Sequence, residues 1–230
     1  MHWINAAAAL ALAITGTAAA QMPAVPAAPP AQVQPRFVVV LDPAHGGSDI
    51  GAHLQNGLME KQITLALSQR LGSALRARGI EVVATRVSDQ SLPALNRAET
   101  ANHAQAAACL VLHATATGSG VHLYTSSLAP VAPARLLPWP TAQAAWVAQS
   151  LRLEAEIDTA LAHTQVPVTL GRASVPPMDN LTCPTVAVEI APLVAGHVTA
   201  ARDLGDAAYQ KSVVDSLAAA LESWQNDWKQ

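Results

Sequence analysis

The 230-residue chain is long enough to bury a full core, and its length favours one domain with tails over two domains. Charged residues make up 13% of the chain and the formal net charge is −3, with no run of Lys or Arg that could follow a phosphate backbone, so we expect no nucleic-acid partner. Aromatic residues make up only 3%, so the apolar surface of the core must come mostly from Ala, Leu and Val.

The N-terminal part of the chain has the pattern of an export signal followed by a linker. An apolar stretch at residues 6–14 precedes the small residues 18–20, which is typical of a signal-peptide cleavage site, although no Lys or Arg comes before it. We expect residues 1–20 to be a signal peptide. The prolines that follow favour an extended linker at residues 21–36. Because a bilayer span needs about 20 apolar residues, we expect no membrane span in the mature chain.

From residue 37 onward, strands and helices are predicted to alternate. A continuous apolar, β-branched run predicts a buried strand at residues 37–41, and apolar residues at four-residue spacing from Ile63 to Leu75 predict an amphipathic helix at residues 60–78. The same patterns predict strands at residues 80–85, 109–113, 121–125 and 185–190, and helices at residues 94–106, 141–163 and 206–228. Prolines predict a loop at residues 126–140. This order predicts a single α/β domain with a mostly parallel, twisted sheet and helices on both faces.

Four ionisable side chains fall where an open parallel sheet places its functional loops, beyond the carboxyl ends of the strands. They are His45 after the first strand, Glu60 at the head of the first helix, His113 at the end of the third strand, and Glu189 near the end of the last strand. Two imidazoles and one carboxylate are the protein ligands of a catalytic zinc, which keeps a fourth position for water. Glu189, outside that set, has the chemistry of a general acid and base.

A purely structural interpretation of these four residues competes with the metal site. His45 could be a loop histidine, and Glu60 could be a carboxylate that complements the dipole of its helix. His113 and Glu189 both interrupt apolar strands, where an unpaired charge is costly and a partner is expected. Composition and spacing alone therefore leave both interpretations open.

The segments around these residues resemble the zinc-dependent N-acetylmuramoyl-L-alanine amidases found among cell-separation and sporulation hydrolases. The matching segments are Val38-Val-Val-Leu-Asp42-Pro-Ala-His45-Gly-Gly47, Asn56-Gly-Leu-Met-Glu60-Lys61, Leu110-Val-Leu-His113-Ala-Thr115 and Val186-Ala-Val-Glu189-Ile190. Arg86 and the block from Asn96-Arg97 to Ala101-Asn102 are similar as well. The resemblance implies a catalytic amidase domain at residues 37–228.

The resemblance also implies a reaction, which is hydrolysis of the amide bond between the lactyl group of N-acetylmuramic acid and L-alanine in peptidoglycan. It implies Zn2+ on His45, Glu60 and His113, with Glu189 as the catalytic carboxylate. Peptidoglycan is the expected partner, the need for an activator protein is left open, and the periplasm is the expected location, with the cell wall or the extracellular space as the alternative. Three residues are expected substrate contacts: Arg97, Asn102 and Thr115.

The chain departs from the pattern of that family at the rim of the expected site. Thr115 stands where the family usually has Asn, and Ala191-Pro192-Leu193 follows the glutamate where the family usually has a Gly-Phe segment. These changes affect substrate positioning more than metal binding. No extra insertion of the kind that plugs the site in some relatives precedes Glu189, so we expect no built-in inhibitory helix.

Three other functions remain alternatives at the level of the sequence. A catalytically idle peptidoglycan-binding module would suit the export signal and the linker, although a glutamate in an apolar strand argues against it. Two histidines and a carboxylate also describe non-haem iron oxygenases, whose usual β-barrel the alternating elements do not predict. A serine or cysteine hydrolase is set aside, because the sequence has no G-x-S-x-G motif and because Cys109 and Cys183 are expected in apolar surroundings that would raise a thiol pKa.

The remaining histidines, cysteines and tryptophans are given structural interpretations. Cys109 and Cys183 are interpreted as two small buried residues, with a single disulfide left open. His53 is interpreted as a solvated loop histidine, and Trp139 and Trp146 as packing residues of the proline-rich loop. Four further histidines have no partner in the motifs and are expected to be structural: His103, His122, His163 and His197.

Overall fold

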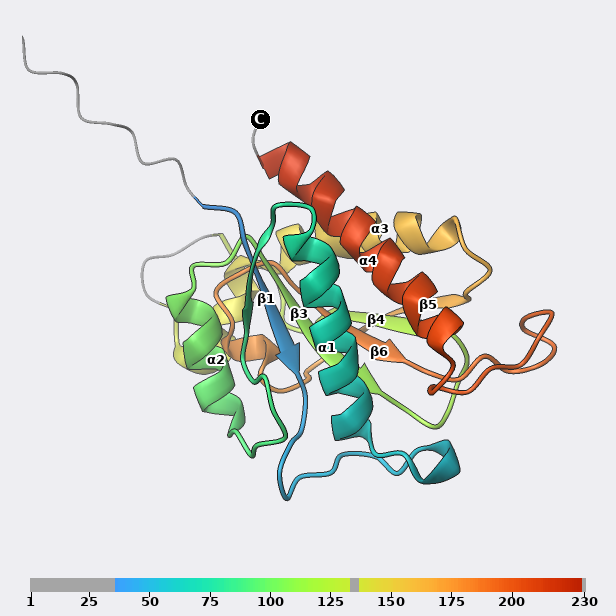
Figure 1. Ribbon diagram of the computed structural model, residues 1–230. Coiled ribbons are helices and arrows are strands. Elements are labelled where there is room, and N and C mark those ends of the chain that lie inside the picture. Colours follow the sequence, from blue (N-terminus) through green and yellow to red (C-terminus); the bar gives the residue numbers. More distant parts are fainter. Residues whose placement is uncertain (1–35, 133–136, 229–230) are drawn as a thin grey trace, which may run out of the picture. The chain divides into compact units, whose positions relative to one another are not determined.

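The computed structural model describes residues 36–132 and 137–228, which form a six-stranded sheet with helices on both faces (Figure 1). The strands are β1 Val38–Pro43, β2 Glu81–Ala84, β3 Ala108–Ala114, β4 Val121–Ser126, β5 Val168–Ala173 and β6 Thr185–Ile190. The helices are α1 Glu60–Arg76, α2 Ala94–His103, α3 Val147–Ala162 and α4 Ala207–Trp228, with 3-10 helices η1 Gln55–Gly57, η2 Trp139–Ala145 and η3 Met178–Asn180. The expected signal peptide, and the expected linker up to residue 35, lie outside the described residues.

The sheet is mostly parallel, as the sequence predicts. Its strand order is β2-β1-β3-β6-β4-β5, and the four strands β2, β1, β3 and β6 run parallel. β4 runs antiparallel to β6 and parallel to β5. The register places Glu189 of β6 between His113 of β3 and His122 of β4, so three ionisable residues lie in one row across the sheet.

Alternate residues of the strands pack against different helices, which is why the sheet is covered on both sides. Leu41, Leu110 and Val188 belong to the larger core cluster, which they share with buried residues of α1, α3 and α4. Val40 and Val111 belong to a smaller cluster on the other side, together with residues of α2 and η3. Figure 1 shows α1 and α4 lying over the same face of the sheet.

The helices each bury one face, in agreement with their amphipathic patterns. The predicted apolar stripe of α1 is buried at Ile63, Leu67, Leu71 and Leu75. α4 is 22 residues long and buries Leu217 and Leu221 on its inner side. Within residues 36–132 and 137–228, none of the helices has both the length and the apolar content that crossing a membrane requires.

Two expectations about local structure are wrong. The helix expected from residue 141 begins at Val147, because the preceding residues form η2, where Thr141 has a φ of −129° and leaves the helical region. β5 was not expected at all. It is an edge strand with mostly half-buried and exposed side chains, so it lacks the apolar run that marks a buried strand.

Cys109 and Cys183 form a disulfide, which corrects their interpretation as two separate buried cysteines. Their Cα atoms are 6.1 Å apart, within the usual range for a bridge, and each residue is 1% exposed. The bridge joins β3 to the segment that enters β6, two neighbouring strands that are separated by 74 residues along the chain. A disulfide typically stabilises the folded state by about 2–4 kcal/mol, mainly by restricting the unfolded chain.

Candidate metal centre

The three predicted metal ligands meet at the carboxyl edge of the sheet. His45 lies in the loop after β1, Glu60 is the first residue of α1, and His113 lies on β3. One ligand atom from each residue lies within 4.8 Å of the others. Glu60 bridges the two imidazoles, with its Oε2 3.1 Å from Nε2 of His45 and its Oε1 2.8 Å from Nδ1 of His113.

A buried arginine holds the loop that carries His45 against the head of α1. Arg86 is only 1% exposed and donates hydrogen bonds of 2.9 Å to the carbonyls of Pro43, Ala44 and Lys61. These carbonyls flank His45 on one side and Glu60 on the other. The guanidinium therefore fixes the spacing of two predicted ligands without contacting either.

Glycine at position 51 leaves the space that the cluster needs. A Cβ atom there would lie 2.6 Å from Oε2 of Glu60 and 2.7 Å from Cδ2 of His45, and the φ of +66° is also one that glycine adopts easily. The close approach lets the loop fold over the two side chains. Two imidazoles and a carboxylate in this cradle fit the donor set of a catalytic zinc.

The surroundings of Glu60 keep its carboxylate ionised. Burial opposes the charged form, but hydrogen bonds from His113, from His45 and from the backbone N–H groups of Ala52 and Ala114 outweigh it and hold the pKa of Glu60 well below its usual range. The hydrogen bond with Glu60 in turn raises the pKa of His45. The negative charge of this carboxylate, placed between two imidazoles, favours binding of a cation.

Asp49 contacts the other nitrogen of His45, and sequence reasoning missed this role. Both carboxylate oxygens of Asp49 lie 2.9 Å from Nδ1 of His45, and Oδ1 also accepts a hydrogen bond from the N–H of Gly51. A carboxylate behind a ligating histidine sets the orientation of the ring and the position of its proton. The only signal in the sequence was an aspartate four residues after the histidine.

The predicted catalytic residue, Glu189, lies on β6 beside His113 and is 27% exposed at its side chain. Its Oε2 is 2.8 Å from Nδ1 of His122 on β4. The expectation that His122 has no partner is therefore wrong. The antiparallel pairing of β4 with β6 brings this histidine opposite the glutamate.

The predicted substrate contacts lie in different surroundings. Arg97 is 8% exposed and forms an ion pair with the buried Asp42 at 2.7 Å. The side chain of Asn102 bonds to the segment 180–182 through both its oxygen and its nitrogen. Thr115 is partly exposed just beyond the end of β3. The substrate contacts of all three residues stay predictions.

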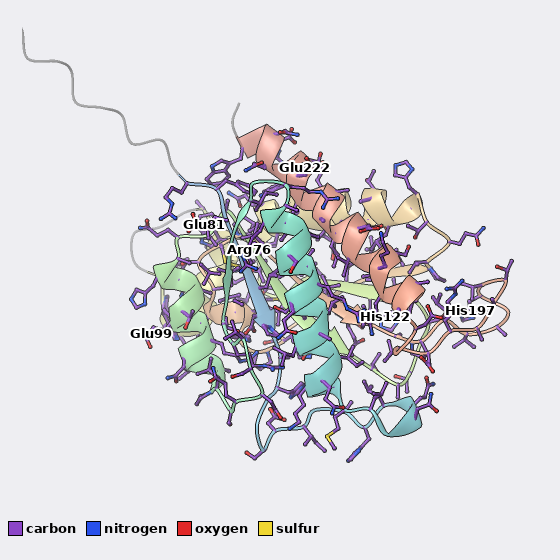
Figure 2. All side chains as sticks on the ribbon, viewed as in Figure 1. Arg76, Glu81, Glu99, His122, His197 and Glu222 are labelled. Atoms are coloured by element: carbon purple, nitrogen blue, oxygen red, sulfur yellow. A yellow bond between two sulfur atoms is a disulfide. The ribbon has the colours of Figure 1, made fainter. Side chains whose placement is uncertain are left out.

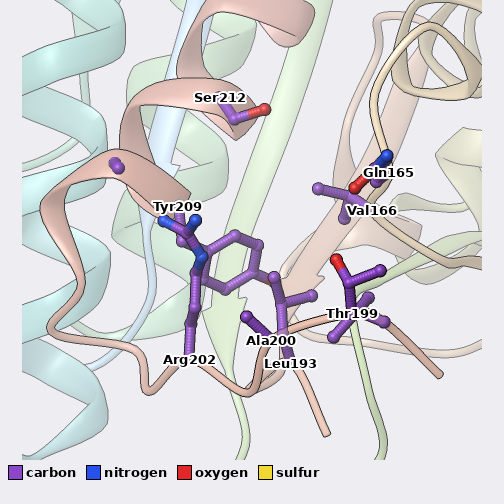
Figure 3. A pocket seen from close by; sticks show the side chains of 10 residues that line it. Gln165, Val166, Leu193, Thr199, Ala200, Arg202, Tyr209 and Ser212 are labelled. Carbon is purple, nitrogen blue, oxygen red and sulfur yellow. The ribbon is translucent and has the colours of Figure 1, made fainter. Parts of the chain in front are cut away.

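A separate pocket lies where the loop after β6 meets the start of α4 (Figure 3). It has a volume of about 240 Å³, and its walls include Leu193, Arg202 and Tyr209. The hydroxyl of Tyr209 donates to the carbonyls of Gly120 and Ala191, at 2.8 and 2.7 Å. None of the four candidate site residues lines this pocket, so it is distinct from the metal centre.

The sheet and the His-Glu-His cluster at its carboxyl edge define an α/β protein with a candidate catalytic metal centre. The model of the N-acetylmuramoyl-L-alanine amidase family, Amidase_3, matches residues 39–223. The chain belongs to this family, which confirms the resemblance found in its motifs.

Individual relatives agree with this assignment. The N-acetylmuramoyl-L-alanine amidase AmiA of Escherichia coli K12 is 43% identical over 77 residues, which are 34% of this chain and 27% of that protein. The catalytic domain of the amidase CwlV from Bacillus (Paenibacillus) polymyxa var. colistinus has a TM-score of 0.64 at 21% identity, covering 83% of this chain and 98% of that one. The amidase Ami1 of Mycobacterium smegmatis has a TM-score of 0.66 at 20% identity, covering 83% and 97%. The two structures share the fold, whereas the match to AmiA spans about a quarter of its length.

Proposed function

We propose that this chain is a zinc-dependent amidase that hydrolyses the bond between the lactyl group of N-acetylmuramic acid and L-alanine in peptidoglycan. The observation that carries the proposal is the cluster of His45, Glu60 and His113 within 4.8 Å, with Glu189 beside it on the neighbouring strand. The names of the relatives, which are N-acetylmuramoyl-L-alanine amidases, support the choice of substrate.

His45, Glu60 and His113 would hold the zinc and leave a fourth position open to solvent and substrate. When bound, zinc supplies a Lewis acid that polarises the amide carbonyl and lowers the pKa of water to about 7. Asp49 holds Nδ1 of His45, which leaves Nε2 facing the cluster. Zinc is favoured over iron because this chain folds as an open α/β sheet rather than a β-barrel.

Glu189 is the proposed general base and acid. It takes a proton from the attacking water as the new C–O bond forms, and it passes that proton to the L-alanine nitrogen as the C–N bond breaks. The products are a lactyl carboxylate on the sugar and a stem peptide with a free amino group, which takes up the second proton of the water as an ammonium. Its side chain is 27% exposed, so a substrate can reach it. Arg97, Asn102 and Thr115 remain the proposed substrate contacts.

The proposal also places the reaction outside the cytoplasm. Residues 1–20 are the proposed signal peptide, residues 21–36 the linker and residues 37–228 the catalytic domain, and the periplasm is the proposed location. The disulfide between Cys109 and Cys183 supports an oxidising compartment, because such bridges persist there and are rare in the cytosol.

The proposal is tested by digesting purified sacculi with residues 21–230, with and without a zinc chelator. We expect release of stem peptides with a free L-alanine amine, loss of release on chelation, and recovery when zinc is restored. Glu189→Gln should lower the rate by about 10²- to 10⁴-fold and keep its zinc, because only the proton transfer is removed. Glu222→Gln, which changes an exposed glutamate on α4, is the matched control.

Other outcomes separate the alternatives. Full activity in Glu189→Gln would contradict its role as the base. Binding of sacculi by the wild type and by Glu189→Gln, with cutting by neither, would favour a catalytically idle peptidoglycan-binding module. If the wild type cuts only after a protein extract from the cell envelope is added, an activator protein joins peptidoglycan as a partner.

A further inference from the structure

His122 approaches Glu189 directly across the β4–β6 ladder. The two residues are partners in the antiparallel register, and Nδ1 of His122 lies 2.8 Å from Oε2 of Glu189. The histidine side chain is 12% exposed, against 27% for the glutamate side chain. The imidazole is therefore the more buried of the two side chains. Figure 2 labels His122 on the ribbon.

The imidazole ring of His122 is held in place by its neighbours. A Cβ atom at Gly118 would lie 2.4 Å from Cε1 and 2.6 Å from Nε2 of the ring, so only glycine allows the ring to occupy this position. Gly118 also has a φ of +83°, which glycine adopts without strain. The ring of Tyr124 also stands edge-on to the imidazole, at a centroid distance of 6.4 Å. Because the ring of His122 has little freedom to move, it can restrict the orientation of the Glu189 carboxylate that it contacts.

The chemistry of the contact fixes the direction of the hydrogen bond. A carboxylate that acts as a base must be ionised and then only accepts hydrogen bonds, so the proposed role of Glu189 requires the Nδ1–H group of His122 to donate the hydrogen bond to Oε2. This bond occupies one carboxylate oxygen and leaves Oε1 to meet a water molecule. A general base must keep such an orientation, because a displacement of about 1 Å can cost roughly 100-fold in rate.

We propose that His122 is a positioning residue that holds the Glu189 carboxylate in the orientation from which it acts on water. The inference rests on the proposed amidase function and assigns a role in it that the metal-site motifs do not contain. His122 itself neither binds the metal nor exchanges a proton with the substrate. Its contribution is the fixed Nδ1–H donor on β4.

Three substitutions separate a fixed donor from mere packing. His122→Leu keeps a similar volume and removes the donor. His122→Asn puts its amide N–H near the place of Nδ1, whereas His122→Gln puts it near the place of Nε2. His163→Leu, at an exposed histidine just after α3, is the control. The measurements are kcat and KM on a soluble N-acetylmuramoyl peptide, zinc content, and thermal unfolding.

We expect His122→Leu to lower kcat by about 10- to 100-fold with KM changed less than about threefold and zinc content unchanged. His122→Asn should recover to within about fivefold of wild type, and His122→Gln should recover less. Wild-type kcat in His122→Leu would overturn the proposal. Equal losses in all three variants, in step with a lower unfolding temperature, would also overturn it, because packing alone would then explain them.

A second measurement tests the hydrogen bond between His122 and Glu189 without relying on activity. It therefore remains informative if the wild-type protein cuts nothing, which would contradict the proposed function. Nitrogen NMR of the zinc-loaded protein reports which ring nitrogen of His122 carries the proton. A proton on Nδ1 whose signal shifts in Glu189→Gln supports the contact. A neutral ring with its proton on Nε2 overturns it.

Discussion

His45 and Glu189 each contact a side chain of the opposite chemical type. A carboxylate contacts the histidine, and an imidazole contacts the glutamate. On the β1 side, the carboxylate of Asp49 holds the imidazole of a predicted metal ligand. On the β4–β6 side, the imidazole of His122 holds the carboxylate of the predicted base. The first pair is four residues apart in one loop, and the second joins residues 67 apart on two strands.

The difference between these two regions lies in what each pair can affect. The pair of Asp49 and His45 acts on a ligand, so damage there should appear as weaker metal binding. The pair of His122 and Glu189 acts on the base, so damage there should appear as a lower rate at full metal occupancy. Measuring zinc content and kcat separately on the same variants distinguishes the two.

The largest effect is expected from Glu60, the carboxylate that bridges both predicted histidine ligands. Glu60→Gln removes the only charged ligand of the cluster, so zinc affinity should fall by at least about 100-fold and activity with it. Metal analysis after dialysis against a weak chelator checks this, with Glu222→Gln as the control. A dialysed variant that keeps one zinc per chain would show that the cluster is not the metal site.

The disulfide joins β3, which carries the predicted ligand His113, to the segment that enters β6, which carries Glu189, and its loss should act on stability alone. Replacing Cys109 and Cys183 together by Ala should lower the free energy of unfolding by about 2–4 kcal/mol, measured in urea. Zinc content should not change, because Cys109 lies near the start of β3 and His113 near its end. A variant that loses zinc but keeps its stability would contradict this separation.

A smaller effect is expected from Asp49, because its side chain is 62% exposed. Asp49→Ala should weaken zinc binding by about tenfold, at the low end for residues that orient a ligand, and should leave kcat at saturating zinc within about threefold. Competition with a fluorescent chelator measures the affinity. Asp215→Ala, at an exposed aspartate on α4, serves as the reference. A fall in kcat of Asp49→Ala at full zinc occupancy would contradict the expectation that Asp49 affects metal binding whereas His122 affects the rate.

The smallest effect concerns Glu154 of α3, the helix that packs behind β4 and β6. Burial raises its pKa from 4.5 to about 7, and its Oε1 has no hydrogen-bond partner in the described part of the chain. The folded state therefore binds a proton more tightly than the unfolded state, so stability should fall as the pH rises from about 4.5 to about 7 and level off above that.

We expect Glu154→Gln to remove this pH dependence and to be the more stable protein at pH 8, because the amide carries no charge that burial would oppose. Urea unfolding at several pH values between 5 and 8 measures the slope. The same slope in the wild type and in Glu154→Gln would assign the pH dependence to other groups. Zinc content should be equal in both proteins, since Glu154 belongs to neither pair.

Local sequence patterns predicted where His45, Glu60 and His113 lie along the strands and the first helix, and the resemblance to the amidase family favoured them as metal ligands. His45 and His113 follow or end apolar runs that form β1 and β3, and parallel strands bring those ends to one edge. Glu60 begins a helix with a clear apolar stripe. Each position could be assigned before any pairing between strands was known.

Three of the missed features depend on pairings between distant segments, whereas the missed contact of Asp49 with His45 lies within one loop. His122 appeared to lack a partner because nothing in its own run shows that β4 turns antiparallel and meets β6 with His122 opposite Glu189. The disulfide requires β3 and β6 to be neighbours, although Cys109 and Cys183 are 74 residues apart. β5 has neither an apolar run nor a clean alternation, so its place at the edge comes from pairing with β4.

The strand order sets when the site is completed during synthesis of the chain. β6 is the last strand along the sequence, yet it pairs between β3 and β4 near the middle of the sheet. A growing chain that has reached residue 130 contains all three predicted ligands but neither Glu189 nor the strand that would present it. Pairings between distant segments form slowly. When β6 pairs with β3 and β4, the same step joins β2-β1-β3 to β4-β5 and brings Glu189, the proposed base, to the site. On the proposed function, a partly made chain would lack the residue that activates water, so we expect it to leave peptidoglycan uncut.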